Sequence, residues 1–256
     1  MNKLLIPLTA AAVALLPACG STPESGTPAP TASAVSKPTP TPAPVVLTRA
    51  DIGQKVQAAL KKQGTYRMRL TDPSDKSFLV TATVKYNGAK QDFSISSDDG
   101  SVVGVAGQYY YQDGPLNSDS TEWKKYNPKA KGLDALTSAL IKAYLVQVQT
   151  PRLLAGAPYA TRFVTTSGPV VDRVPTTKYA MVLDVKKAVA AKAFGDYLTG
   201  EIPEDEKLLP VTAVVDRDGL LRQLDYGVGS DRSSIAFSNF GDSVFISEPA
   251  PDQIKR

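Results

Sequence analysis

The residue types that most enzymes use for chemistry are scarce in this chain. Its 256 residues include one cysteine and no histidine. Without histidine there is no imidazole base for a serine or cysteine nucleophile, and the usual zinc ligand is missing. No glycine-rich phosphate loop stands between a strand pattern and a helix pattern, which excludes nucleotide sites of that kind. The sequence therefore predicts no metal, no cofactor and no active site built on histidine.

Carboxylates are the remaining groups that could catalyse a reaction, as they do in glycoside hydrolases. The aspartates have simpler explanations, however. Asp99 and Asp218 each precede a glycine in a turn pattern. Asp51 and Asp184 stand at expected helix starts, where a carboxylate accepts hydrogen bonds from free N–H groups. We therefore expect that the protein is not an enzyme, and a carboxylate-based hydrolase stays as an alternative.

The single cysteine, Cys19, follows a pattern typical of exported bacterial lipoproteins. Lys3 gives a positive start, Leu4–Leu16 is almost wholly apolar, and Leu16-Pro17-Ala18 leads into the cysteine. An apolar run this short indicates a secretion signal, because a membrane span needs about 20 apolar residues. The last four residues resemble the lipobox, although Pro17 departs from its usual pattern. The alternative is an ordinary signal cleavage beside an unpaired cysteine, but that cleavage prefers a small residue where Leu16 stands.

We therefore predict that residues 1–18 are a lipoprotein signal peptide and that Cys19 is the lipidation site, carrying palmitate-like acyl chains. Each buried CH₂ contributes about 0.8 kcal/mol, so two or three chains hold a protein on a membrane almost permanently. The expected location is outside the cytoplasm, lipid-anchored to the cell membrane and facing the periplasm or cell wall.

The segment after Cys19 is unsuited to folding. From Gly20 to Pro44 the chain consists mainly of Ser, Thr, Pro, Ala and Gly, without an aromatic residue. Such a composition buries too little apolar surface to fold, so we predict a disordered Pro/Thr/Ser-rich tether over residues 19–46. The folded domain is expected to span residues 47–256. The net charge is +4, and the basic residues are scattered among acidic ones. We therefore expect no nucleic-acid partner.

Hydrophobic periodicity divides the folded region into helices and strands. Thr48 and Asp51 resemble a capping box ahead of a helix that Gly64 ends. A period of two follows through Tyr86 and the Asn87-Gly88 turn. Two more hairpins, at 99–100 and 106–107, and a short strand with Trp123 and Tyr126 complete an antiparallel meander of about six strands.

The turn at Asn87-Gly88 permits a prediction of register. A two-residue loop there pairs Val84 with Gln91, Ala82 with Phe93 and Val80 with Ile95. Two of these three pairs are apolar on both sides, which favours the arrangement.

The second half of the chain begins with an apolar helix over Gly132–Gln149. Thr150-Pro151 starts a second short helix that Gly156 is expected to end. Asp184 is expected to cap another helix, which continues to about Asp196. The remaining period-two segments predict strands at 160–166, 177–183, 208–215, 220–228, 233–240 and 244–246.

These elements predict an α+β fold. A long antiparallel sheet twists by some 20–25° per strand, so it must curve, and its apolar face must be covered by the available helices. We predict a large curved antiparallel β half-barrel of about 10–11 strands with three to four helices on its concave face.

The helix over 132–149 carries an unusually broad apolar stripe, formed by Leu133, Leu136, Leu140, Tyr144 and Val148 with Ile141 and Leu145 beside it. Core packing explains such a stripe, and so does one wall of an apolar cavity between helix and sheet. Periodicity alone favours core packing.

Several short segments then occur in a characteristic order, namely Val105-Ala106-Gly107-Gln108-Tyr109-Tyr110, Val174-Pro175-Thr176-Thr177-Lys178-Tyr179, Val215-Asp216-Arg217-Asp218-Gly219-Leu220 and Phe240-Gly241-Asp242-Ser243-Val244-Phe245-Ile246. Their order and spacing resemble the actinobacterial LppX/LprG-type lipoproteins, which share the fold of the LolA/LolB carriers. The resemblance covers nearly the whole chain from Cys19 onward.

The resemblance implies a hydrophobic cavity between sheet and helices that takes acyl chains of lipids or glycolipids and carries them toward the outer envelope. The candidate lining residues on the helix are Leu133, Leu136, Leu140, Ile141 and Tyr144. Those on the facing strands are Val80, Ala82, Phe93 and Ile95. The implied partners are a lipid or glycolipid, the membrane and a membrane transporter. The alternative is a non-catalytic envelope adaptor or sensor of the same fold, with a closed core and a protein partner.

Overall fold

The computed structural model describes residues 46–71, 79–88, 90–114, 121–126, 133–195, 207–228 and 231–255. The chain divides into two units, Met1–Pro42 and Ala43–Arg256, and every described residue belongs to the second. The predicted signal peptide, Cys19 and almost all of the predicted tether lie outside the described residues. Among the described helices, none has the length and apolar character needed to cross a bilayer.

The first half of the second unit is one helix followed by six strands. They are α1 (Ile52–Gln63), β1 (Thr65–Thr71), β2 (Leu79–Asn87), β3 (Lys90–Ser97), β4 (Gly100–Val105), β5 (Gln108–Asp113) and β6 (Lys124–Lys125). The second half contains α2 (Leu133–Gln149), the 3₁₀ helix η1 (Thr150–Tyr159), β7 (Ala160–Ser167), β8 (Thr176–Asp184), α3 (Val185–Ala190), β9 (Leu208–Asp216), β10 (Leu221–Val228), β11 (Asp231–Ser238) and the short 3₁₀ helix η2 (Pro251–Gln253).

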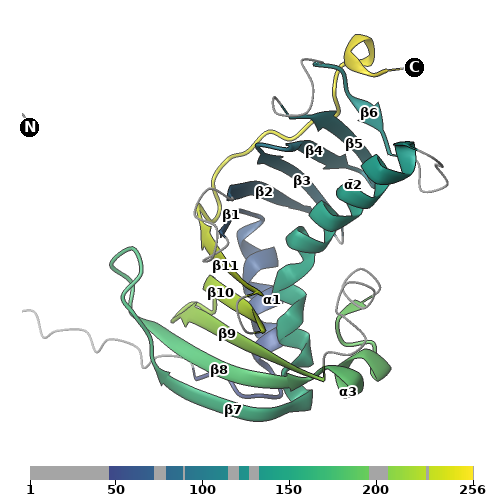
Figure 1. Ribbon diagram of the computed structural model, residues 1–256. Helices are drawn as coiled ribbons and strands as arrows, with labels where there is room; N and C mark the ends of the chain where they lie inside the picture. The colour runs from purple at the N-terminus through teal and green to yellow at the C-terminus, as the bar shows by residue number, and fades with distance from the viewer. Residues whose placement is uncertain are drawn as a thin grey trace, which may run out of the picture. The chain divides into compact units, whose positions relative to one another are not determined.

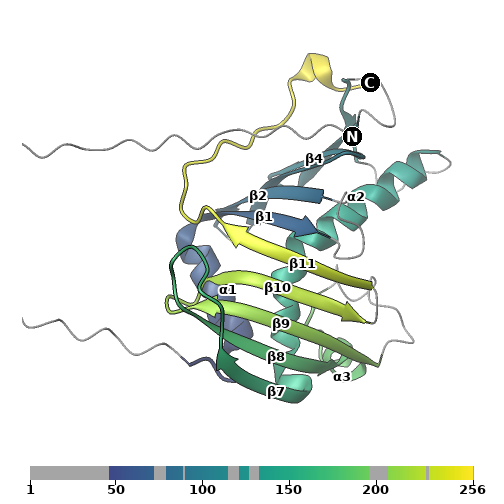
Figure 2. The same cartoon turned by 60° about the vertical axis from the view of Figure 1, so that its left-hand side comes forward.

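The strands form a single antiparallel sheet of eleven strands in the order β6-β5-β4-β3-β2-β1-β11-β10-β9-β8-β7. The pairing of β1 with β11 joins the two meanders in the middle of the sheet. The sheet bends and does not close, and α1, α2 and α3 lie on the side toward which it bends (Figure 1). A view turned by 60° shows α2 running behind the strands across both meanders (Figure 2). The predicted α+β fold class is confirmed.

The core lies between the inner face of the sheet and the helices. Period-two burial in β1 places Tyr66, Met68 and Leu70 on this face, and the same alternation continues across the other strands. The helices contribute Ile52, Val56 and Leu60 from α1 and Ile141 and Val148 from α2, each at most 1% exposed. One continuous apolar cluster joins all these side chains.

Helix α1 ends where the sequence predicts, but it begins at Ile52, with Asp51 as the N-cap residue, and not directly after Thr48. The backbone N–H of Thr48 donates to the Asp51 carboxylate at 2.6 Å, which is half of the predicted capping box. Gly64 ends the helix with φ of 78°, a left-handed conformation in which glycine has no Cβ to clash.

The predicted register of β2 and β3 is wrong by one loop position. Asn87 and Lys90 form the closing pair, Val84 lies opposite Phe93, and Ala82 lies opposite Ile95. Gly88, at φ of 64°, takes the left-handed loop position that the prediction gave jointly to Asn87 and Gly88. Shifting the loop by one residue changes each pairing by two, so every side chain keeps its predicted face.

Two predicted helix ends are also wrong. The helix after Gln149 passes through Gly156 to Tyr159; a Cβ on Gly156 would lie 2.5 Å from the Phe194 ring, so this glycine permits close packing and does not end the helix. The helix after Asp184 ends at Ala190, since Lys192 and Gly195 adopt positive φ.

The predicted strand at 244–246 is absent from the described structure, where residues 242–250 have no regular secondary structure. Phe245 is 91% exposed, so the alternating pattern there does not reflect a sheet face. This segment instead follows the outside of the sheet (Figure 1), where the Tyr110 hydroxyl donates to Glu248 at 3.0 Å. Its end pairs with Trp123 through Ile254.

Asp216 organises the turn between β9 and β10. Its side chain is fully buried. One carboxylate oxygen accepts the N–H groups of Asp218 at 2.9 Å and Leu220 at 3.0 Å. The other accepts the Arg222 guanidinium at 2.8 and 2.7 Å. The turn between β9 and β10 and the ion pair with Arg222 therefore both depend on the Asp216 side chain.

Candidate functional site

Helix α2 is joined to the sheet by apolar packing and by two polar contacts. Ile141, Tyr144, Leu145 and Val148 are each at most 5% exposed and face the core. The Tyr144 hydroxyl lies 2.5 Å from the Ser97 hydroxyl. Near the other end of the helix, the amide of Gln149 donates to Gln91 at 3.1 Å. These two hydrogen bonds connect α2 to β3, one toward each end of the strand.

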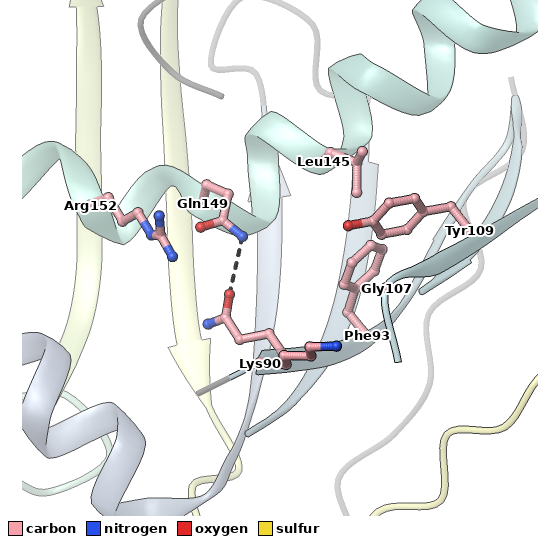
Figure 3. Close-up of a pocket in the computed structure, with 8 residues that line it drawn as sticks. Lys90, Phe93, Gly107, Tyr109, Leu145, Gln149 and Arg152 are labelled. Atoms are coloured by element: carbon pink, nitrogen blue, oxygen red, sulfur yellow. Dashed lines mark hydrogen bonds between the residues drawn. The ribbon is translucent and has the colours of Figure 1, made fainter. Parts of the chain in front are cut away.

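A pocket of about 230 Å³ opens beside the second of these contacts, between the end of α2 and the strands β3 and β5. Figure 3 shows Leu145 and Gln149 reaching toward it from the helix, with Phe93 and Tyr109 below. The complete lining is Lys90, Gln91, Phe93, Gly107, Tyr109, Leu145, Gln149 and Arg152.

The lining of this pocket combines apolar and polar groups. Phe93, Tyr109 and Leu145 form an apolar wall, in which the two rings stack with centroids 5.9 Å apart. The polar lining residues are Lys90, Gln91, Gln149 and Arg152. Figure 3 shows Lys90 reaching toward Phe93 and Arg152 on the far side of Gln149. The pocket can therefore accommodate an apolar group and a polar group of one ligand.

A buried aspartate shapes the far rim. Asp92, which is 6% exposed, accepts the Ala106 N–H at 2.9 Å. Ala106 and Gly107 both have positive φ, at 52° and 88°. The bond from Asp92 stabilises this tight turn, which brings Gly107 to the pocket without a side chain that would fill it.

One buried polar atom of the lining, Gln149 Oε1, has no hydrogen-bond partner among the described residues. The Tyr66 hydroxyl is also buried and has no hydrogen bond of good geometry, although Tyr86 and Gln91 interact with it. Tyr66 is 1% exposed. Burial raises the pKa of Tyr66 well above its ordinary value of 10.0, and Tyr86 raises it further, while Arg152 and Gln91 act in the opposite direction. Two lining residues therefore lie within electrostatic range of the Tyr66 hydroxyl.

Tyr66→Phe tests whether this hydroxyl is unsatisfied in the free protein. Because the folded-state pKa is raised, folding favours the neutral tyrosine. Its contribution to stability is therefore complete at pH values below the unfolded pKa near 10.0 and is lost as the pH rises above that value. We expect Tyr66→Phe to leave the free energy of unfolding at pH 7 unchanged or higher by about 1 kcal/mol, and to make it fall less between pH 9 and 11. Urea titrations at each pH measure both effects, and a large loss at pH 7 would contradict them.

The structure brings six of the predicted lining residues together in the core. Val80, Ala82, Phe93, Ile95, Ile141 and Tyr144 are all at most 8% exposed and belong to one apolar cluster. Phe93 also lines the pocket. Leu133, Leu136 and Leu140 lie in α2, but their side chains are outside the described residues. Their role in lipid binding stays a prediction.

The sequence reasoning missed seven of the eight lining residues. Leu145 had been placed beside the apolar stripe, but Lys90, Arg152 and Gln149 carried no signal, because only the packing of α2 against β3 brings them together. A second depression of about 280 Å³ lies over β7, β8 and β9, with Arg162 and Val164 in its lining. None of the buried unpaired polar atoms found in the described residues belongs to it.

No protein-family model matches the chain, and no curated protein matches its sequence. Among solved structures, it is similar to LprF from Mycobacterium bovis, at 15% identity and a TM-score of 0.42, covering 78% of this chain and 97% of that one. It is also similar to lipoprotein LppX from Mycobacterium tuberculosis, at 14% identity and a TM-score of 0.40, covering 78% of this chain and 98% of that one. A LolA superfamily protein from Nitrosomonas europaea has 10% identity and a TM-score of 0.22, covering 81% of this chain and 96% of that one.

Proposed function

We propose that this protein is a membrane-anchored envelope lipoprotein that binds and carries lipid or glycolipid, with acyl chains held between the sheet and α2. The observation that carries the proposal is the pocket at the end of α2. Its apolar wall, Phe93, Tyr109 and Leu145, continues into the apolar interface between helix and sheet. Lipid attached to Cys19 and the tether would hold the carrier at the membrane, where a transporter is the proposed partner.

The free pocket is too small for a whole lipid. Its volume of about 230 Å³ is below the roughly 300–1,000 Å³ of most ligand pockets. We propose that α2 moves away from β3 when a chain enters. The two hydrogen bonds lost would each cost about 1 kcal/mol, while each CH₂ buried gains about 0.8 kcal/mol. A few methylenes therefore offset both bonds.

Leu145→Trp is expected to block the pocket. The larger ring would occupy the space between α2 and Tyr109, so we expect lipid binding to fall at least tenfold, measured with a fluorescent fatty-acyl probe and the mature chain. Because an overpacked core loses about 1–3 kcal/mol, the unfolding midpoint is measured as well.

Ala143→Trp is the matched control, since position 143 is on the same helix and exposed. It adds the same ring outside the interface and should leave binding unchanged. Equal binding by wild type and folded Leu145→Trp would contradict the proposed site.

The alternative function, an adaptor or sensor with a closed core and a protein partner, is favoured by one observation. The predicted lining residues with described side chains are almost completely buried, as in an ordinary core. This alternative expects no lipid binding by the wild type and no effect of Leu145→Trp beyond stability.

A further inference from the structure

The two edges of the sheet are protected to different extents. The edge strand β6 has only the two residues Lys124 and Lys125, and Ile254 forms a bridge with Trp123 directly before it. At the opposite edge, β7 (Ala160–Ser167) has eight residues and pairs with β8 alone among the described strands. Figures 1 and 2 place β7 at the lower end of the sheet. A strand of this length with one neighbour can accept a further strand.

The backbone of β7 directs hydrogen-bonding groups away from the sheet at alternate residues. The N–H of Gly168 donates to the carbonyl of Thr176 at 2.9 Å, and these two residues continue the register of β7 and β8. Bonded and non-bonded residues alternate along an antiparallel strand, so Phe163, Thr165 and Ser167 direct their N–H and C=O groups outward. In the described part of the chain, no other segment bonds to the backbone of these three residues.

The free part of β7 lacks the usual protection against pairing. Its residues 163–167 are Phe, Val, Thr, Thr and Ser, without a proline or a charge, and phenylalanine, valine and threonine favour strands. A bulge is present only at the start of the strand, between Ala160 and Arg162. Because only an extended backbone can bond to a row of free N–H and C=O groups, this edge is suited to one more strand.

Three cations lie along the edge. Arg162 is in β7 itself, Lys178 is on β8 opposite Thr166, and both side chains are exposed. At the start of the strand, the guanidinium of Arg49 donates to the carbonyl of Ala160 at 3.2 Å. None of these cations forms an ion pair with a described residue, and β7 contains no acidic residue. The edge therefore attracts a negatively charged segment.

The outer face beside the edge is mainly apolar. The depression of about 280 Å³ there is lined by Arg162, Val164, Ala180, Val182 and Pro210, among others. Residues two apart in a strand are on the same face. A strand antiparallel to β7 would therefore place one side chain beside Val164, which is 37% exposed, and the side chain two residues later beside Arg162. This arrangement favours an apolar residue followed two positions later by an acidic one.

We propose that β7 is a docking edge for a protein partner, which contributes an extended acidic segment as one more strand antiparallel to β7. The backbone of residues 163–167 bonds to this segment, Arg162 pairs with its carboxylate, and Val164 contacts its apolar side chain. The interaction uses the outer edge of the sheet and is independent of any ligand between α2 and the sheet.

The test measures fluorescence anisotropy of a labelled peptide, acetyl-Thr-Val-Thr-Val-Thr-Glu-Thr-amide, with the mature chain carrying Cys19→Ser. We expect this peptide to bind at least tenfold more tightly than the same peptide with lysine in place of glutamate. Arg162→Gln should remove most of that difference, because it removes the cation that faces the glutamate.

Thr165→Pro tests the backbone pairing. Proline removes the outward N–H and leaves the hydrogen bonds between β7 and β8 in place, as it does in other edge strands, so binding of the glutamate peptide should fall at least tenfold. Thr165→Val is the matched control, since it keeps the N–H and should bind as the wild type does. Urea midpoints show that both variants are folded.

The other outcomes contradict the proposal in different ways. Binding of neither peptide by the wild type, or full binding by folded Thr165→Pro, would overturn the docking edge. Equal affinities for the two peptides would overturn the acidic character of the partner. Self-association of the wild type that Thr165→Pro abolishes, measured by analytical ultracentrifugation, would identify a second copy as the occupant and overturn the assignment to another protein.

Discussion

Replacing Cys19 by serine is expected to release the protein from the membrane fraction. Two or three acyl chains bind a bilayer almost irreversibly, at about 0.8 kcal/mol per buried CH₂, and serine offers no sulfur for their attachment. The residues after the proposed signal peptide are mainly Ser, Thr, Pro, Ala and Gly and are not expected to provide a replacement anchor. Immunoblots of membrane and soluble fractions measure the effect.

The experiment needs a signal peptide that is cleaved without lipidation, because an uncleaved apolar segment would itself retain the protein. Residues 1–18 are therefore exchanged for a signal processed by the general peptidase, with Cys19→Ser in the mature chain. The control keeps the natural segment and Cys19, and should stay in the membrane through a high-salt wash. Retention of the serine variant after complete cleavage would contradict anchoring through Cys19.

Asp216→Ala is expected to cost about 3–5 kcal/mol of unfolding free energy, because it removes one partner of a buried ion pair and leaves Arg222 only the exposed Asp172 at 3.7 Å. Arg222 would keep its charge with a side chain 13% exposed, over the Phe240 ring at 4.8 Å. The N–H groups of Asp218 and Leu220 would also lose their acceptor. Total stabilities are about 5–15 kcal/mol, so urea titration should show a much lower midpoint.

Two variants separate the buried carboxylate from charge in general. Asp172 lies 3.7 Å from Arg222 but is 68% exposed, so Asp172→Ala should change stability by less than about 1 kcal/mol. Asp216→Asn can keep one acceptor for the turn and should lose less than the alanine variant. Equal losses for Asp172→Ala and Asp216→Ala would show that the burial of Asp216 is unimportant.

The fold was largely predictable because local rules and burial agree in most elements. Thr48, Asp51 and Gly64 mark the limits of α1, and strict alternation in β1 and β2 identifies the inner face. The failures arise where a residue has two roles. Gly156 was expected to end a helix but is needed for contact with Phe194. Asn87 was expected in the loop but pairs with Lys90 in the sheet, which preserves the faces of β2 and β3 and changes the partners.

The pocket was much less predictable than the fold. Its lining comes from β3, β5, the turn between β4 and β5, α2 and η1, and no periodic pattern relates a lysine at position 90 to an arginine at position 152. The apolar stripe of α2 identifies the side of the helix that packs against the core. The pocket, however, opens at the last turn of the helix. Predicting it would require the angle at which α2 crosses the sheet, which depends on packing between distant residues.

Native mass spectrometry of the protein from its own host, extracted without denaturation, tests the lipid carrier most directly. We expect a stoichiometric lipid with the wild type and with Ala143→Trp, and at least a tenfold lower lipid-bound fraction with Leu145→Trp. Wild-type protein free of lipid, or a bound fraction unchanged by Leu145→Trp, would contradict lipid binding between α2 and the sheet.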